Sequence, residues 1–302
     1  MPPTLSQERR ARVGEVELAY QTIGDRSDPP MLLIMGLASQ MIGWPNAFCE
    51  LLADRGFFVI RFDNRDCGRS TVLDGAGTPS PRDALDGGAA AVPYTLSNMA
   101  GDAAGILDAL EASPAHVLGV SMGGMIAQTL AIERTERVLS LASIMSTTGD
   151  PSVGQATPEA QAVLFRRPPL DDREVFAKEI VNVRAVIGSQ GLERDEEWSR
   201  EVARQAFDRG IHPDGTMRQI AAIMASGDRT EALHGLDVPT VVIHGRDDPL
   251  IGVSRGEATA AAIPDAELVL IDGMGHDLPP AAWERLADSI VANAARARAP
   301  TT

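Results

Sequence analysis

The sequence predicts an α/β protein in which a mostly parallel sheet is flanked by helices. Short apolar runs recur along the chain, and from Met31 onward most of them are nearly continuous in Val, Ile, Leu and Met. Such runs are expected of parallel strands that are covered on both faces. Segments with helical spacing lie between the runs, which is typical of an α/β layer fold. A chain of 302 residues can bury one large core, alone or with a sizeable insertion.

Seven apolar runs are predicted to be strands. They cover residues 15–23, 29–35, 57–63, 115–120, 139–145, 239–245 and 266–272. A helix is predicted over 96–112, because Met99, Ala103 and Ile106 fall on one helical face and Thr95 can cap its start. The stretch 73–93 is rich in Gly, Pro, Asp and Ala and predicts a long mobile loop.

Residues 150–230 have helical spacing but no strand signal. Phe176, Ile180, Val183 and Ile187 recur at intervals of four, three and four residues. We therefore expect three parts: a first part of the core at 1–149, an inserted helical cap at 150–230, and a second part of the core at 231–302.

Charge and cysteine content narrow the class of partner. The net charge of −15 would repel phosphate backbones, and no basic stripe offsets it, so nucleic acid is not an expected partner. Two cysteines, Cys49 and Cys67, cannot build a disulfide framework. No signal-peptide stretch opens the chain and no window approaches 18 apolar residues, so we expect a cytoplasmic protein without a membrane partner. The oligomeric state stays open.

Ser121 lies where a predicted strand passes into a predicted helix, within Gly119-Val120-Ser121-Met122-Gly123. This is G-x-S-x-G at a strand-to-helix turn, where the glycines remove side chains that would clash and the hydroxyl is held above the sheet. A serine here can also simply cap the helix. We predict a nucleophile, which needs a base in hydrogen-bonding reach and a third group to orient that base.

His276 is the predicted base among five histidines. It directly follows the last predicted strand, in a loop rich in Gly and Pro, and loops at the carboxyl ends of parallel strands carry the chemistry of such folds. The alternative is an ordinary loop histidine. The remaining histidines are expected to be structural: His116, His212, His234 and His244.

The acid is expected between Ser121 and His276 in the chain, just past a strand. Asp247 and Asp248 both stand there. We favour Asp248 because Pro249 restricts its backbone to extended conformations, whereas Asp247 would be the acid if the turn were one residue shorter. The order Ser, Asp, His matches that of one fold family.

No cofactor and no metal are expected. The chain contains no H-E-x-x-H, Walker or G-x-G-x-x-G pattern, and "HGRDD" is a poor metal site without further ligands nearby in the sequence.

With these residues in place, the chain resembles the α/β-hydrolase superfamily over nearly its whole length. "RFDNRDCGRS" is similar to the family's D-x-R-G-x-G-x-S loop, "HGRDDPLI" to its acid loop, which favours Asp248, and "GMGHDLP" to its histidine loop. Within the superfamily, "LLIMGLASQMIGWP" and "SMGGMIAQ" most resemble bacterial carboxylesterases of the aclacinomycin methylesterase type. The resemblance implies a serine hydrolase that cleaves small-molecule carboxylic esters through an acyl-enzyme. A methyl ester of a bulky, polyketide-like molecule is one candidate substrate.

The resemblance also implies an oxyanion site. By position the family's oxyanion residue falls on Leu37, after a Met35-Gly36 pair where many relatives have His-Gly. The expected donors are the backbone N–H groups of Leu37 and Met122.

Two further groups of residues lie near the expected site. Candidates for an adaptable apolar pocket, with ordinary core packing as the alternative, are Met35, Met41, Trp44, Met125 and Met274. In "RFDNRDCGRS", the residues expected to hold the shape of the loop are Asp63, Arg65 and Ser70.

Other functions on the same three residues stay open at this point. They are lactone hydrolysis, carbon–carbon bond hydrolysis and cofactor-free perhydrolysis. A rival from another class is a ligand-binding protein that keeps the fold and turns over too slowly to matter.

Overall fold

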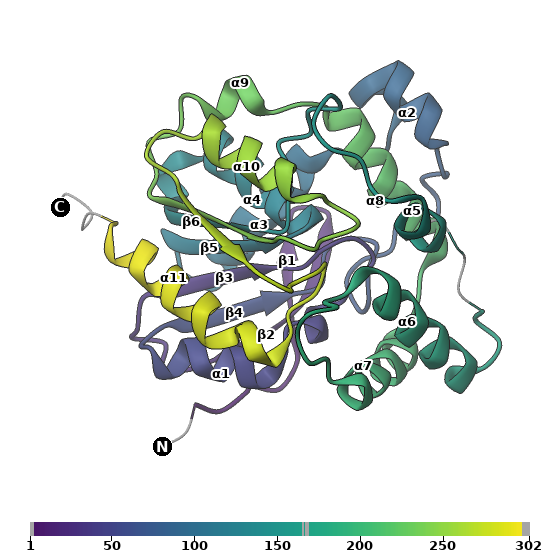
Figure 1. Ribbon diagram of the computed structural model, residues 1–302, viewed down its shortest axis with the longest axis horizontal. Helices are drawn as coiled ribbons and strands as arrows, with labels where there is room; N and C mark the ends of the chain where they lie inside the picture. The colour runs from purple at the N-terminus through teal and green to yellow at the C-terminus, as the bar shows by residue number, and fades with distance from the viewer. Residues whose placement is uncertain (1–2, 165, 167–168, 298–302) are drawn as a thin grey trace.

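The structure is a computed structural model that describes residues 3–164, 166 and 169–297 (Figure 1). Within these residues the sheet has eight strands in the order β1-β2-β4-β3-β5-β6-β7-β8. The β1–β2 and β2–β4 pairs are antiparallel, and the remaining pairs are parallel. The strands are β1 (Arg9–Val13), β2 (Val16–Ile23), β3 (Pro30–Ile34), β4 (Phe58–Phe62), β5 (Ala115–Val120), β6 (Val138–Ile144), β7 (Thr240–Gly245) and β8 (Glu267–Ile271).

All seven predicted strands form, but the prediction missed β1. This strand pairs only with β2, through a turn at Gly14 and Glu15, and its arginines are exposed. None of the residues of β1 is buried, so "RRARV" lacks the apolar run by which the other strands were found.

Helices cover both faces of the sheet (Figure 1). One face carries α1 and α11, and the other carries α3, α4 and α10, each over its own apolar core. The helix predicted over 96–112 is α3, and its N-cap Thr95 donates to the Asn98 side chain from its N–H and its hydroxyl. These helices are α1 (Asn46–Asp54), α3 (Leu96–Ala109), α4 (Met122–Glu133), α10 (Val253–Ala262) and α11 (Trp283–Ala295).

The prediction of a mobile loop over 73–93 was wrong for its second half. α2 (Pro81–Gly87) and the 3₁₀ turn η2 (Gly88–Ala91) form there, and both contact α8. Ser80 caps α2 by accepting a hydrogen bond from the Asp83 N–H, and Pro81 occupies the first helical position. Both are recognised helix-start signals, which the loop-rich composition around them obscured.

The chain between β6 and β7 folds into helices, as the spacing predicted. Phe176, Ile180 and Ile187 lie on one helix, α6, which packs against α7 with the rings of Phe176 and Phe207 5.5 Å apart. Figure 1 shows α5 to α8 beside the sheet and away from its two faces. The helices are α5 (Pro158–Leu164), α6 (Arg173–Ile187), α7 (Glu196–Arg209), α8 (Pro213–Ser226) and α9 (Thr230–Leu233). We refer to residues 150–230 as the inserted segment.

Shorter 3₁₀ turns complete the described elements. They are η1 (Met41–Gly43), η3 (Thr135–Arg137) and η4 (Pro280–Ala282).

A buried ion pair joins the inserted segment to the sheet. Arg218 on α8 donates two hydrogen bonds to Asp66, of 2.7 and 2.8 Å, and both side chains are at most 1% exposed. Burial alone would raise the pKa of Asp66, but hydrogen bonds from Arg218, the Leu73 N–H and Tyr94 hold it below its ordinary value. Because neither charge meets water, losing one partner would leave the other buried and unpaired.

The loop that follows β4 has the structural role predicted for it. Asp63 accepts hydrogen bonds from the N–H groups of Met41 and Arg69, and the Ser70 hydroxyl donates to the Asp63 carbonyl at 2.6 Å. Arg65 pairs with Asp102 of α3 at 2.6 and 2.7 Å. Arg209 from the inserted segment also pairs with Asp63 and with Glu8. Burial nevertheless raises the pKa of Asp63 above its ordinary value.

Candidate active site

Ser121 occupies a strained turn between β5 and α4. Its φ of +56° lies in the left-handed region, which a residue with a side chain rarely adopts. A Cβ at Gly119 would lie 2.0 Å from the Gly123 carbonyl oxygen, and a Cβ at Gly123 would lie 2.1 Å from the Ile34 carbonyl oxygen. The glycines on either side of the serine are therefore required for helix α4 to begin this close to the sheet.

His276 joins Ser121 to Asp248. Its Nε2 lies 3.0 Å from the Ser121 Oγ, and its Nδ1 lies 2.7 Å from the Asp248 Oδ2. An ionised carboxylate only accepts hydrogen bonds, so Nδ1 carries the proton and Nε2 is free to accept one from the serine. The three side chains form one hydrogen-bonded row of the kind that activates a serine hydroxyl.

Asp248, and not Asp247, contacts the histidine. The Asp248 side chain is fully buried, and its Oδ1 accepts hydrogen bonds from the N–H groups of Leu250 and Ile251 at 2.9 and 2.8 Å. These bonds leave Oδ2 pointing at the imidazole. Asp247 is exposed, and its N–H donates to the Met274 carbonyl.

The remaining histidines have local partners of their own. His116 Nδ1 bonds to the Ser140 hydroxyl at 2.8 Å, and burial lowers its pKa to about 4. The His244 ring donates from Nε2 to the Ile251 carbonyl at 2.7 Å, and burial also lowers its pKa. His212 bonds to the Gly68 carbonyl, and His234 lies beside Glu231.

The loop that holds Leu37 approaches Ser121 closely. A Cβ at Gly36 would lie 3.2 Å from the Ser121 Cβ, so the loop brings Leu37 close to the serine. Met122 is close to the serine because it is the next residue in the chain. The next residue, Ala38, has a φ of +55°, and its N–H donates to the Gln219 side chain at 2.9 Å.

Gln219 was not found from the sequence. Its amide bridges two loops, because it accepts from the Ala38 N–H and donates to the Arg65 carbonyl at 2.8 Å. It stands 181 residues from Ala38 in the chain, on a helix of the inserted segment, and no local pattern indicates the contact. The inserted segment therefore holds the backbone next to Leu37.

Comparison with known proteins assigns the family. A family model described as the alpha/beta hydrolase fold matches residues 29–279. The chain belongs to the α/β-hydrolase family.

The curated relatives of this α/β hydrolase include two from Streptomyces. Rhodomycin D methylesterase DauP of Streptomyces sp. (strain C5) is 31% identical over 92% of this chain and 95% of its own. Rhodomycin D methylesterase DnrP of Streptomyces peucetius is 30% identical over the same shares. Among solved structures, the enol-lactonase from Burkholderia xenovorans LB400 superposes with a TM-score of 0.72 at 22% identity, over 95% of this chain and 100% of its own. The likeness to the enol-lactonase concerns the fold alone.

A cavity of about 1040 Å³ opens at the serine of this α/β hydrolase. Ser121, His276 and Leu37 line it from the sheet side, and α6, α7 and α8 line it from the inserted segment. Of the five residues predicted for an apolar pocket, Met35 and Met125 line this cavity.

The other three pocket candidates were predicted wrongly. Trp44 and Met274 have no exposed surface and lie in the core under α1 and α11. Met41 is also fully buried, and its N–H is bound by Asp63. Proximity in sequence to the catalytic loops did not reveal which side of each loop faces the core.

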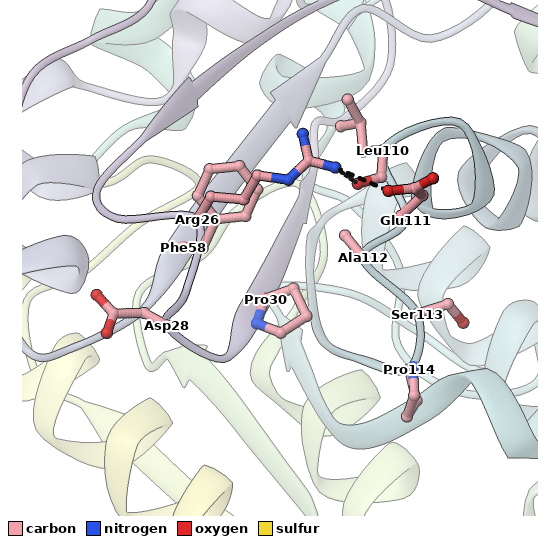
Figure 2. Close-up of a pocket in the computed structure, with 9 residues that line it drawn as sticks. All are labelled: Arg26, Asp28, Pro30, Phe58, Leu110, Glu111, Ala112, Ser113 and Pro114. Carbon is pink, nitrogen blue, oxygen red and sulfur yellow. Dashed lines mark hydrogen bonds and ion pairs between the residues drawn. The ribbon is translucent and has the colours of Figure 1, made fainter.

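A second, smaller hollow of about 160 Å³ lies at the opposite edge of the sheet (Figure 2). It is lined by Pro30, Phe58 and Pro114, at the amino ends of β3, β4 and β5. Arg26 reaches across it to the Leu110 carbonyl at 2.8 Å. The guanidinium of Arg26, the charged donor of this lining, is thus already hydrogen-bonded to other residues of the hollow.

Two negative findings concern the described residues. Within 3–297, apart from 165, 167 and 168, no three or more His, Cys, Asp or Glu side chains are grouped as metal ligands. Over the same part of the chain, no helix has the length and apolar character needed to cross a membrane.

Proposed function

We propose that the protein is a serine hydrolase that cleaves carboxylic esters through an acyl-enzyme. The observation that carries this proposal is the row of hydrogen bonds from Ser121 Oγ through His276 to Asp248, at 3.0 and 2.7 Å. Membership of the α/β-hydrolase family and the two methylesterase relatives support it.

In the first step of the proposed reaction, the Ser121 oxygen attacks the ester carbonyl carbon while His276 Nε2 takes the hydroxyl proton. Asp248 holds the imidazole in the required tautomer and stabilises its positive form. The tetrahedral intermediate then collapses, the C–O bond to the alcohol breaks, and the alcohol leaves with the proton from Nε2. Water, deprotonated by the same histidine, attacks the acyl-enzyme and releases the acid and free Ser121.

The N–H groups of Leu37 and Met122 are the proposed oxyanion donors. Each such donor contributes on the order of 3 kcal/mol to the transition state in comparable enzymes. The close approach of Gly36 to Ser121 and the hold of Gln219 on Ala38 support this assignment for Leu37. Met122 begins helix α4, where backbone N–H groups have no helical partner and the helix dipole favours negative charge.

We infer that residues 150–230 act as a cap that covers the substrate. We also infer that the substrate class is a methyl ester of a bulky, largely apolar molecule. The cavity of about 1040 Å³ between the sheet edge and the inserted helices supports a cap and a bulky substrate, and the two methylesterase relatives support a methyl ester. The proposed mechanism uses no cofactor and no metal. We also propose a cytoplasmic location.

The test is hydrolysis of a panel of p-nitrophenyl esters by the protein and by Ser121→Ala. We expect turnover of short to medium acyl chains and at least about a thousandfold loss of kcat in the variant. Equal rates in the two proteins would rule out the mechanism. If p-nitrophenyl esters are inert while a lactone or a vinylogous diketone is cleaved in a Ser121-dependent way, the same residues serve a different reaction.

A further inference from the structure

Arg184 stands out among the charged residues of the cavity. It lies on α6, and its guanidinium carbon is 5.1 Å from the centre of the Trp198 ring on α7. Both residues line the cavity that contains Ser121. Among the described residues, the buried Nη1 of Arg184 has no hydrogen-bond partner. A buried charged donor without a partner costs free energy, so its retention calls for an explanation.

Among the residues that the structure describes, the other arginines that line the cavity have acceptors within the protein. Arg166 pairs with Glu179 at 2.8 Å, Arg229 donates to the Thr147 carbonyl at 2.9 Å, Arg255 donates to the Gly154 carbonyl at 2.9 Å, and Arg194 donates to the Ala185 carbonyl at 3.1 Å. Burial lowers the pKa of Arg184 to about 10, so the group still carries its charge at neutral pH. Arg184 therefore offers a positive charge and a free donor to whatever enters.

The neighbouring acidic side chains are held by other groups. The charge of Asp277 acts on Arg184, but the Asp277 carboxylate accepts hydrogen bonds from the N–H and hydroxyl of Ser189 at 3.0 and 2.5 Å. No ion pair joins Asp277 to Arg184 in the described residues. Asp195 caps α7 by accepting from the Trp198 N–H.

Arg184 lies about one helical turn from a residue that contacts the His276 loop. Ile187, three residues later on α6, accepts a hydrogen bond from the His276 N–H at 2.7 Å. Residues three apart share a helix face, about one turn from each other. A group bound at Arg184 would therefore belong to the same small molecule whose ester reaches Ser121.

We propose that Arg184 binds an anionic oxygen of the substrate, so that the preferred esters carry a second, acidic group such as a carboxylate. Arginine suits this task because its planar fork matches a carboxylate and bonds it with two charge-assisted hydrogen bonds. The Trp198 ring under the guanidinium restricts its orientation before the substrate arrives. This inference rests on the proposed ester hydrolysis.

The test compares two p-nitrophenyl esters with the same six-carbon acyl chain, the neutral hexanoate and the anionic adipate monoester. In Arg184→Gln we expect kcat/KM for the adipate monoester to fall at least about tenfold relative to the hexanoate, mainly through KM. Arg184→Lys keeps the charge but not the fork and should lie between. The matched control is Arg166→Gln, which removes a cavity arginine that Glu179 already neutralises and should change the ratio less than about twofold.

An unchanged ratio in an Arg184→Gln protein that still hydrolyses the hexanoate would overturn the inference. If the unmodified protein hydrolyses neither ester, this result would instead contradict the proposed function. If Arg184→Gln does not fold, the unmodified protein gives the answer by competition against hexanoate hydrolysis. Monomethyl adipate should then inhibit at least about tenfold more strongly than dimethyl adipate, and equal inhibition would contradict the proposal.

Discussion

The carboxyl edge of the sheet and the inserted segment hold their side chains by different means. At the sheet edge the backbone does most of the positioning. The Ser121 N–H donates to the Ile144 carbonyl at 2.9 Å, and Asp248 is bound by two N–H groups of its own turn. In the inserted segment, side chains reach across long sequence separations, as Arg218 does to Asp66 and Gln219 to Ala38.

This difference separates two roles. A backbone scaffold tolerates few changes of geometry, which suits groups that must meet within hydrogen-bonding distance during a reaction. The inserted segment is held by such side chains and by a few backbone bonds at its ends and loops, for example from the His276 N–H to the Ile187 carbonyl, so the side chains that line its cavity can vary without disturbing the sheet. We therefore expect changes at the sheet edge to act on kcat. Changes in the inserted segment should act on substrate choice or on stability, except at Gln219, which holds the backbone next to Leu37.

The largest expected effect lies at the sheet edge and uses two adjacent acids. Asp248→Asn should lower kcat on the order of 10⁴-fold, because an amide donor facing Nδ1 forces the wrong imidazole tautomer. Asp247→Asn should leave kcat within about twofold, because this side chain is exposed and makes no contact with His276. Steady-state kinetics on one p-nitrophenyl ester tests the pair. An equal loss of kcat in both variants would contradict the assignment of Asp248 alone as the partner of His276.

The next effect concerns the junction between the two regions. Arg218→Met should lower the free energy of unfolding by about 3–5 kcal/mol, because it leaves the Asp66 carboxylate buried without its partner. Urea denaturation near neutral pH measures this loss. As a control, Arg173→Met removes the exposed pair with Asp208 on α6 and α7 and should not move the midpoint. A midpoint unchanged by Arg218→Met would show that the junction does not depend on this pair.

A smaller effect distinguishes the regions by pH. The pKa of His116, in β5, falls from 6.5 to about 4 in the folded protein because of burial. Between these two pKa values, His116 is protonated in the unfolded chain but neutral in the folded protein. The free energy of unfolding is therefore unaffected by His116 above about pH 6.5 and decreases as the pH falls toward 4. At pH 4.5 the loss is about 2–3 kcal/mol.

His116→Asn removes the titrating group and keeps an acceptor near Ser140. The difference in unfolding free energy between pH 7.5 and 4.5 should then shrink by about 2–3 kcal/mol relative to the unmodified protein. The Asp66–Arg218 pair does not interfere, because a lowered carboxyl pKa costs stability only at lower pH, below the ordinary value of 3.8. An identical pH dependence in both proteins would place the acid sensitivity elsewhere.

The sequence predicted the sheet edge far better than the inserted segment. Ser121 and Asp248 follow the buried strands β5 and β7, and His276 follows the edge strand β8. Each stands in a short pattern, and parallel strands bring their carboxyl ends together whatever the rest of the chain does. Gln219 and Arg184 have no such signal, because their roles depend on where α6 and α8 dock. The same limit explains Trp44 and Met274, whose loops were placed correctly while their side chains turned out to face the core.

The most direct test of the central claim is covalent labelling with a p-nitrophenyl alkylphosphonate, followed by mass spectrometry of the peptides. We predict one phosphonyl group on Ser121, released p-nitrophenol in equal amount, and labelling that is slower by several orders of magnitude in Asp248→Asn. No label on Ser121, or a label on another residue with the same loss of esterase activity, would contradict the account.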